Sequence, residues 1–197
     1  MSREGVFVHP TATVEKGARI GSGTKIWHYA HVRDDAVMGK NCNVGHCAYV
    51  DTGVKVGDNV KIGNKASVFR GVIVENDAFI GPHVAFTNDM RPRSLGEWKL
   101  EKTLVKRGAS IGTNSTIVCG VTLGEDCMIG AGSVVTRDIP ANGLAYGNPA
   151  KLRGFICRCK GNAEKTGKKG GSVILRCREC GQEFPVKGSD YKKTGRG

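Results

Sequence analysis

This sequence has few aromatic residues and no long hydrophobic run, and its charge is unevenly distributed. Phe, Trp and Tyr make up 6% of its 197 residues, which argues against an ordinary packed globule. No run of 18 apolar residues is present, so no membrane-spanning helix is expected. No apolar segment follows a basic start at the N-terminus, so no secretion signal is expected either. We therefore predict a cytoplasmic protein with no membrane partner.

The excess of positive charge lies mostly at one end of the chain. The net charge is +12, and residues 151–197 hold 13 Lys and Arg against 4 Asp and Glu, a net of +9. Residues 1–150 hold 17 against 14, a net of only +3. The basic character therefore belongs to the C-terminal tail, and the length predicts one domain or one domain with a small appendage.

What the sequence does have is a period of six. Val, Ile or another apolar residue occupies every sixth position from 8 to 86, and again from 105 to 135. Such a period does not fit the 3.6 residues of a helical turn, but it fits short strands joined by tight corners. Three strands close a coil of 18 residues. Stacked coils of this kind predict an all-β prism around an aliphatic core.

The period is interrupted once, after Phe86, and resumes at Val105. The intervening segment brings Asn88, Arg91 and Arg93 together, and two neighbouring arginines suit a phosphate or a carboxylate. The alternative is a loop without a function, because an exposed insertion costs little stability.

Four stretches of the sequence carry a resemblance to a known family. They are "IWHYAHV" (26–32), "GPHVAFTNDMRPRS" (81–94), "TLVKRGASIGTNSTIVCGVTLGEDCMIGAGSVVTRDIP" (103–140) and "YGNPAKLRG" (146–154). Together they closely resemble the hexapeptide-repeat N-acetyltransferases that act on nucleotide-linked 3-amino sugars. This group includes UDP-2-acetamido-3-amino-2,3-dideoxy-glucuronate N-acetyltransferase. The resemblance covers residues 5 to about 160.

The resemblance implies a left-handed parallel β-helix over residues 1–153, with an extruded loop at 87–104. The left hand comes only from the resemblance, because the general rule for parallel crossovers predicts a right hand. The usual state of the family is a homotrimer with active sites between neighbours. The implied reaction transfers acetyl from acetyl-CoA to the 3-amino group of a UDP- or dTDP-linked sugar, in the synthesis of surface polysaccharide precursors.

The implied chemistry is attack of a sugar amine on a thioester, which needs alignment and stabilisation of an oxyanion. The matching asparagine of the family is thought to orient the reacting groups, so Asn88 is the first catalytic candidate. His83, beside the loop, is a second candidate as a general base. The family pattern has a small residue at that position, which argues against an obligatory base.

Residues 18 positions apart should stack, which predicts two polar columns. One contains His28, His46 and Asn64, and the other contains Arg70 and Asn88. With "IWHYAHV" and the loop included, the candidate substrate-binding residues are His28, His31, His46, Asn64, Arg70, Arg91 and Arg93. A structural packing role stays open for the histidines.

Acetyl-CoA is expected along the later coils. There "SIGTN" and "MIGAGSVV" offer Gly and Ala edges that an extended pantetheine can approach closely. Lys106, Lys151 and Arg153 are candidates to bind the CoA phosphates, although surface lysines are usually only solvated. The full set of candidates is Lys106, Gly112, Gly130, Ala131, Lys151 and Arg153.

The eight cysteines indicate thiols and a metal site rather than disulfides, because no leader is recognised. Cys157-x-Cys159 and Cys177-x-x-Cys180 fit a closed, structural zinc site in a ribbon over residues 154–186. Within it, "SVILR" and "QEFPV" read as strands, whereas "GNAEKTGKKGG" and the basic tail at 187–197 are expected to be mobile. The remaining cysteines are predicted to be small packing residues: Cys42, Cys47, Cys119 and Cys127.

Two alternative functions use the same features. A γ-type carbonic anhydrase has this prism but needs three histidines meeting between protomers. His46 and His83 are about two coils apart, but no third His lies beyond His83. A trimeric nucleic-acid-binding protein could use the basic ribbon, yet the ribbon and tail offer only Phe184 and Tyr191 for stacking, so nucleic acid is not the expected partner.

Overall fold

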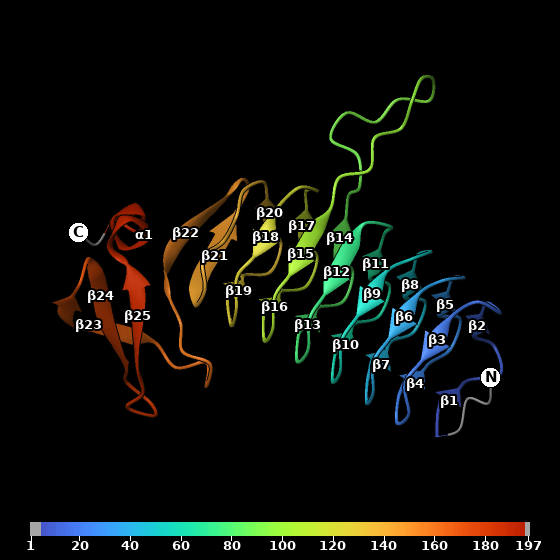
Figure 1. Ribbon diagram of the computed structural model, residues 1–197, viewed down its shortest axis with the longest axis horizontal. Helices are drawn as coiled ribbons and strands as arrows, with labels where there is room; N and C mark the ends of the chain where they lie inside the picture. The colour runs from blue at the N-terminus through green and yellow to red at the C-terminus, as the bar shows by residue number, and fades with distance from the viewer. Residues whose placement is uncertain (1–4, 196–197) are drawn as a thin grey trace.

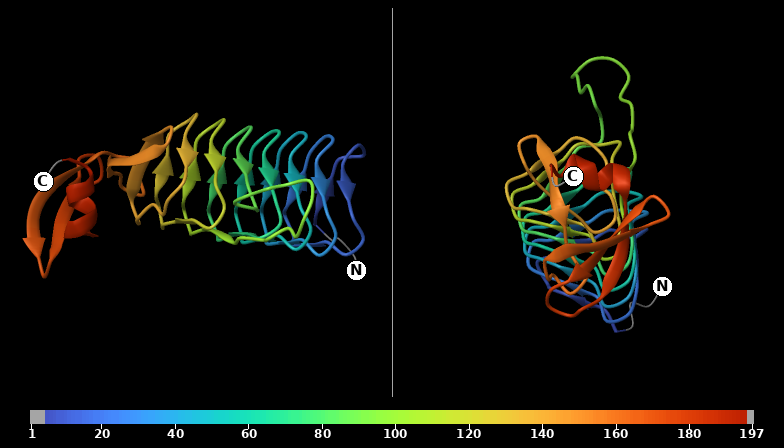
Figure 2. Two further views of the ribbon diagram at one scale, coloured as in Figure 1. Left: turned by 90° about the horizontal axis from the view of Figure 1, so that it is seen from above. Right: turned by 90° about the vertical axis from the view of Figure 1, so that its left-hand side faces the viewer.

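A computed structural model describes residues 5–195 of the protein. The chain winds into a left-handed parallel β-helix and ends in a small three-stranded sheet (Figure 1). Figure 2 shows the stacked coils from above and along the axis, with a single long loop standing away from the stack. The predicted all-β prism is confirmed. Residues 1–4 of the first expected domain and 196–197 of the expected tail lie outside the described residues.

Three parallel sheets form the sides of the prism, and we call them A, B and C. Sheet A contains β1 (Phe7–Val8), β4 (Lys25–Ile26), β7 (Asn43–Val44), β10 (Lys61–Ile62), β13 (Phe79–Ile80), β16 (Ser110–Ile111), β19 (Met128–Ile129), β21 (Gly143–Gly147) and β22 (Ala150–Phe155). Sheet B contains β2 (Thr13–Val14), β5 (His31–Val32), β8 (Tyr49–Val50), β11 (Ser67–Val68), β14 (Ala85–Phe86), β17 (Thr116–Ile117) and β20 (Val134–Val135). Sheet C contains β3 (Arg19–Ile20), β6 (Val37–Met38), β9 (Lys55–Val56), β12 (Val72–Val74), β15 (Thr103–Val105) and β18 (Thr122–Leu123).

The register of the sheets is the 18-residue repeat read from the sequence. Ile26 pairs with Val44, and Val44 pairs with Ile62. Every apolar hexad residue from Ile26 to Val135 is buried, whereas those of the first coil, such as Val8, are half-buried. Short strands of two or three residues suffice because each coil buries its aliphatic side chains against the coils above and below.

The corners between the sheets need unusual backbone conformations. Asn59, Asp77 and Gly53 have φ values of 58°, 61° and 67°, in the left-handed region that Asn, Asp and Gly tolerate best. Other corners need room instead. A Cβ added to Gly81 would lie 2.7 Å from the carbonyl oxygen of Ile111 in the next coil. The glycines of the repeat therefore have a packing role as well as a conformational one.

The loop at 87–104 interrupts the repeat without disturbing the stack. Val74 of β12 pairs with Val105 of β15, which is 31 residues further along rather than 18. Thirteen extra residues therefore leave the prism between β14 and β15, and the parallel pairing resumes at once on their return (Figure 1).

The last coil closes with a strand that reverses direction. Strand β22 runs antiparallel to β21 at the end of sheet A. Asn142 then fixes the chain that leaves the helix, because its carbonyl oxygen accepts the N–H of Ile156 at 2.8 Å and its side-chain amide donates to the Ile156 carbonyl at 3.1 Å. The segment that follows is thereby anchored to the prism.

The C-terminal unit begins at Ile156, after β22, and we call it the ribbon. It contains β23 (Ala163–Lys169), β24 (Ser172–Cys177), β25 (Glu183–Lys187) and helix α1 (Gly188–Lys193). The predicted strands in "SVILR" and "QEFPV" are confirmed. The structure differs from the prediction in two places. The "GNAEKTGKKGG" segment forms β23, because its backbone pairs antiparallel with β24, and part of the expected flexible tail forms α1.

Candidate active site

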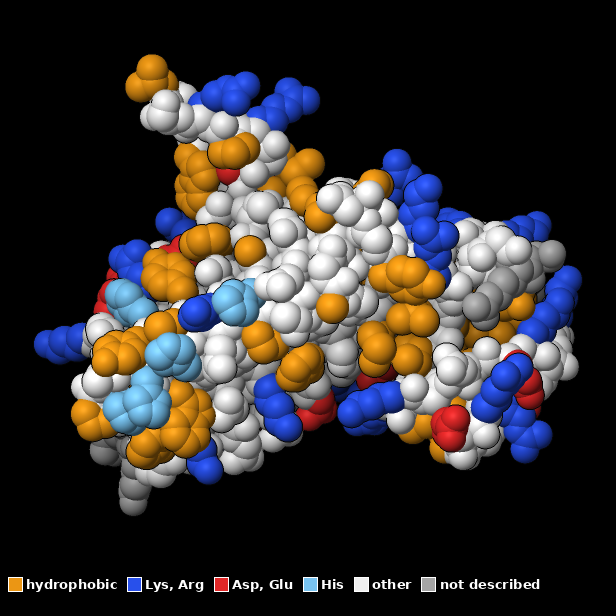
Figure 3. Space-filling view, turned by 180° about the vertical axis from the view of Figure 1, so that it is seen from behind, with side chains coloured by type: hydrophobic (Ala, Val, Ile, Leu, Met, Phe, Trp, Pro, Cys, Tyr) orange, Lys and Arg blue, Asp and Glu red, His pale blue; other side chains and the backbone are white. Residues whose placement is uncertain are grey.

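The turns between sheets A and B bring four predicted residues onto one edge, which we call the histidine corner. The rings of His28 and His46 lie 6.4 Å apart on consecutive coils, and the amide oxygen of Asn64 accepts the N–H of His46 at 2.9 Å. His83 follows one coil later, where its N–H bonds to the Asn64 carbonyl at 2.9 Å. Figure 3 shows imidazoles gathered near the N-terminal end beside apolar side chains.

His83 is exposed and has a φ of 58°. This left-handed backbone is a property of the fold rather than of His83, because Tyr29, Cys47 and Lys65 occupy the same corner position with nearly equal angles. At the first coils His9 joins the corner, with its ring centroid 3.6 Å from that of His28. Burial and the charge of His28 both lower the pKa of His9.

A second group lies at the turns between sheets B and C, which we call the loop corner. Arg70 and Asn88 occupy equivalent positions of consecutive coils, as predicted, and the loop leaves at Asn88. Asp89 organises the base of the loop, because its carboxylate accepts the N–H groups of Arg91 at 2.8 Å and Lys99 at 3.3 Å. The side chains of Arg91 and Arg93 are exposed beyond this point.

The loop also carries apolar side chains that the chain itself does not cover. Met90, Leu95 and Trp98 are 58%, 86% and 50% exposed. Side chains of this kind on a projecting segment are typical of a contact with another molecule.

The two catalytic candidates sit at different corners. His83 precedes strand β14, and Asn88 follows it. The two candidates therefore lie on opposite edges of sheet B, at the histidine corner and at the loop corner.

His31 takes a different position from the other predicted histidines. It lies on the outer face of sheet B, where its Nε2 is 2.8 Å from Oε1 of Glu15. The Glu15 carboxylate also accepts the N–H of Asp34 at 2.9 Å and Nε–H of Arg33 at 3.2 Å. His31 is thus part of a polar network on the first coils, away from the histidine corner.

A groove of about 630 Å³ lies over sheet A. Its floor contains outward side chains of β10, β13, β16 and β19, including Phe79 and Met128. Three of the predicted CoA-binding residues lie on one edge: Gly112, Gly130 and Ala131. The other predicted CoA residues lie elsewhere. Lys106 lines a separate pocket, and Lys151 and Arg153 are exposed on β22, with Arg153 5.6 Å above the ring of Tyr146.

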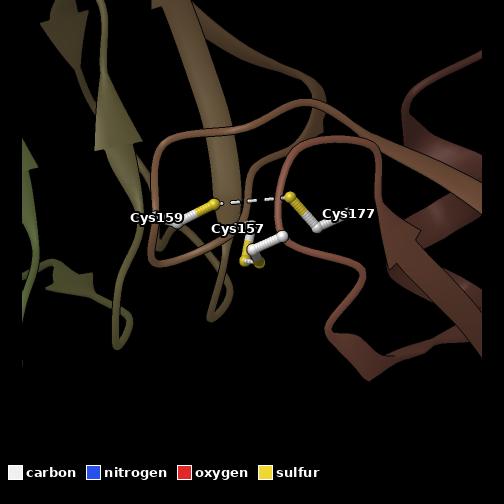
Figure 4. A group of neighbouring side chains, drawn as sticks. Cys157, Cys159 and Cys177 are labelled. Atoms are coloured by element: carbon white, nitrogen blue, oxygen red, sulfur yellow. Dashed lines mark hydrogen bonds between the residues drawn. The ribbon is translucent and has the colours of Figure 1, made fainter.

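The four cysteines of the ribbon converge as predicted. Their sulfur atoms all lie within 4.8 Å of one another, and those of Cys157 and Cys180 are 3.7 Å apart. The sulfurs of Cys159 and Cys177, joined by the dashed line in Figure 4, are 3.4 Å apart. These separations are too long for disulfides. They fit a tetrahedral zinc ion, whose bonds of about 2.3 Å to sulfur place the sulfurs about 3.8 Å apart. The N–H of Cys180 lowers the pKa of Cys177 to about 7, whereas hydrogen bonds with the neighbouring thiols raise the pKa of Cys159.

The other cysteines are a separate population. Cys42, Cys119 and Cys127 are buried, and burial raises the pKa of Cys127 to about 12, so they pack as small thiols as predicted. The prediction was wrong for Cys47, which is exposed because it occupies a corner, with its Sγ 3.3 Å from Nε2 of His46.

The stacked hexads, the interrupting loop and the Gly-edged groove define the class of repeat-built acyltransferases. Residues 17–52 and 102–137 match the model of the bacterial transferase hexapeptide (six repeats), and residues 36–70 match the hexapeptide repeat of succinyl-transferase. The chain is 52% identical to the dTDP-3-amino-3,6-dideoxy-alpha-D-galactopyranose 3-N-acetyltransferase of Aneurinibacillus thermoaerophilus, over 80% of this chain and 82% of that one. The protein belongs to the hexapeptide-repeat transferase family, as the sequence motifs indicated.

More distant similarities agree on the fold. A bifunctional GlmU protein of Nitratidesulfovibrio vulgaris is 34% identical over 72% of this chain, although the match spans only 29% of that protein. The solved structure of the polySia specific acetyltransferase NeuO superimposes with a TM-score of 0.54 at 21% identity, covering 75% of this chain and 72% of that chain. Among the described residues, no helix is long and apolar enough to cross a membrane.

Proposed function

We propose that this protein transfers the acetyl group of acetyl-CoA to the 3-amino group of a dTDP-linked 3-amino sugar. The observation that carries the proposal is the similarity to the dTDP-3-amino-3,6-dideoxy-galactose enzyme over most of both chains. The Gly-edged groove supports acetyl-CoA as the donor. Both co-substrates belong to cytoplasmic metabolism, and eight cysteines without a disulfide are consistent with that compartment.

The reaction is attack of a neutral amine on the thioester carbonyl, followed by departure of the CoA thiolate. Asn88 orients the reacting groups through its amide. His83 is the candidate to accept a proton from the amine, although the departing thiolate can take that proton itself. Arg70, Arg91 and Arg93 supply positive charge for the diphosphate of the nucleotide sugar.

A homotrimer would complete this site. His83 and Asn88 stand at different corners of one copy, so the histidine corner of one copy has to face the loop corner of another. The exposed Met90, Leu95 and Trp98 of the loop give such a contact an apolar part. Analytical ultracentrifugation of the intact protein should give a trimer, and a monomer would overturn the shared site.

The four ribbon cysteines hold one structural zinc ion in this proposal. All four coordination positions are taken by sulfur, so the metal supplies folding energy and no catalytic chemistry.

The function is tested by incubating the protein with acetyl-CoA and a panel of nucleotide sugars, and by finding the product with mass spectrometry. A thiol reagent is a poor detector here, because Cys47, Cys159 and Cys180 are exposed. We expect acetylation of dTDP-3-amino-3,6-dideoxy-galactose to exceed that of the UDP-linked and 4-amino sugars. Absence of product with every 3-amino sugar would refute the proposal.

Replacing Asn88 by Ala should lower kcat by about 10²-fold, the usual effect of losing one polar group that stabilises the transition state. His83→Ala should have a smaller effect. The control is Asn41→Ala, which removes an exposed asparagine at a corner distant from the loop. Unchanged turnover in Asn88→Ala, with the Asn41 variant also active, would remove Asn88 from the mechanism.

A further inference from the structure

The groove over sheet A does not end on the β-helix. Its lining continues onto the start of the ribbon, through Ile156, Cys157, Arg158 and Lys160. We call residues 156–161 the knuckle. The prism and the ribbon thus share one cavity. Gly112, Gly130 and Ala131 of the prism and the knuckle of the ribbon all line it.

The knuckle is held rigidly over this groove. Asn142 forms two hydrogen bonds with Ile156, one through its backbone carbonyl and one through its side-chain amide. The turn itself is closed by the N–H of Lys160 to the Cys157 carbonyl at 2.8 Å, and by the N–H of Cys157 to the Gly161 carbonyl at 3.0 Å. Arg158 and Lys160 alternate with Cys157 and Cys159, so a metal bound to the cysteines fixes the backbone that carries both cations.

The two cations have no acidic partner in the described part of the chain. No carboxylate forms an ion pair with Arg158 or Lys160, and both residues are exposed. The groove lining also contains one further cation, Lys61, and two acidic residues, Asp77 and Asp126. Three cations against two anions, with an apolar floor at Phe79 and Met128, suit a long ligand with an uncharged arm and a phosphate-bearing end.

CoA has this chemistry. Its pantetheine arm is uncharged, and its diphosphate and 3′-phosphate are strongly anionic. From the corner at His83 the coils of Gly112 and Gly130 and then strand β21 follow in order. Three coil rises cover about 14 Å, a distance comparable to an extended pantetheine. A thioester placed near His83 would therefore bring the phosphates to the end of the groove that the knuckle covers.

We propose that the knuckle is part of the acetyl-CoA site, with Arg158 and Lys160 binding the phosphates of CoA. This inference rests on the proposed acetyl-CoA-dependent function and gives the appended ribbon a role in it. The metal on the four cysteines positions the two cations, so metal content and CoA affinity are coupled.

The test is the affinity for CoA, measured by titration calorimetry on the full-length protein. Arg158→Ala/Lys160→Ala should weaken CoA binding by about 10- to 100-fold, as expected for the loss of charge-assisted hydrogen bonds. The matched control is Lys168→Ala/Lys169→Ala, which removes the same charge from β23 of the same ribbon but away from the groove. The control should bind CoA within about 2-fold of the unaltered protein by the same reasoning.

A second ligand locates the contact within CoA. If Arg158 and Lys160 bind the 3′-phosphate, the double variant should bind 3′-dephospho-CoA as well as the unaltered protein does. An equal loss on both ligands assigns the cations to the diphosphate. Removal of the metal by a chelator should weaken CoA binding in the unaltered protein and add nothing in the double variant.

The outcomes separate this inference from the proposed function. If the unaltered protein binds CoA and the double variant binds it equally well, the knuckle is not part of the site, whereas the function stands. If the unaltered protein binds no CoA, both fail. If the double variant changes the oligomeric state and leaves CoA affinity intact, the groove is an interface between copies and the inference is wrong.

Discussion

The β-helix and the ribbon bury their cores in different ways. In the β-helix the hexad side chains from Ile26 onward, such as Ile62, Ile80 and Ile111, are buried between equivalent side chains of neighbouring coils. In the ribbon the core is a handful of residues around Leu175 and Phe184, and β23 contributes mostly exposed side chains. Units of about 40 residues seldom fold alone without a metal or disulfides. Repetition stabilises the first part, whereas the second would gain most from a cross-link such as a metal bound to its four cysteines.

The largest expected effect is that of removing the metal, which should unfold the ribbon and leave the β-helix intact. A structural zinc site contributes on the order of 10 kcal/mol to folding, which exceeds what the small ribbon core supplies. After chelation, hydrogen exchange should show β23, β24 and β25 unprotected while sheets A, B and C keep their protection. A ribbon that stays protected, with metal absent by elemental analysis, would show that its apolar core suffices.

Two glycine substitutions test whether close packing between coils limits the corners of the β-helix. Gly81→Ala places a methyl group 2.7 Å from the Ile111 carbonyl oxygen and 2.8 Å from the Thr113 nitrogen, so it should cost about 3 kcal/mol. Gly53→Ala meets no atom within 4 Å and adds only the strain of a φ of 67°, about 1 kcal/mol. Chemical denaturation measures both. Equal losses would mean that coil contacts do not limit the corners.

The smallest expected effect is a loss of stability in the first coils at acid pH. Hydrogen bonds from the Asp34 backbone and from His31, with the charge of Arg33, lower the pKa of Glu15 in the folded protein. Its stabilising effect is therefore complete above the unfolded pKa of about 4.3 and is lost as pH falls through the folded value. Hydrogen exchange of β2 and β5 should accelerate below that pH, and Glu15→Gln should abolish this dependence. The same pH profile in both proteins would contradict the assignment.

Much of the fold was readable because the repeat is local. The positions of Ile26, Val44 and Ile62 identify the strands, and the return of the period at Val105 identifies the loop. The convergence of the four cysteines could also be predicted, because the short spacing within each pair places its two thiols in one turn. These features depend on neighbours in sequence or on a fixed repeat length.

The remainder depended on contacts between distant segments. Strand β23 has no alternation of apolar residues and forms because β24 offers a partner backbone. The place of Arg158 and Lys160 in the groove follows from the reversed direction of β22 and from the grip of Asn142, neither of which leaves a pattern in the sequence. The placement of His83 and Asn88 at different corners follows from the turns that flank β14, so it becomes apparent only in three dimensions.

The reversal of β22 has a consequence for assembly. A parallel β-helix can in principle grow without limit, because each finished coil is a template for the next and an open end can recruit another molecule into a fibre. An antiparallel last strand presents a different hydrogen-bonding pattern, and the ribbon stands beyond it. Strand β22 therefore ends the parallel register of sheet A at this end of the stack, whereas sheets B and C end on the parallel strands β20 and β18.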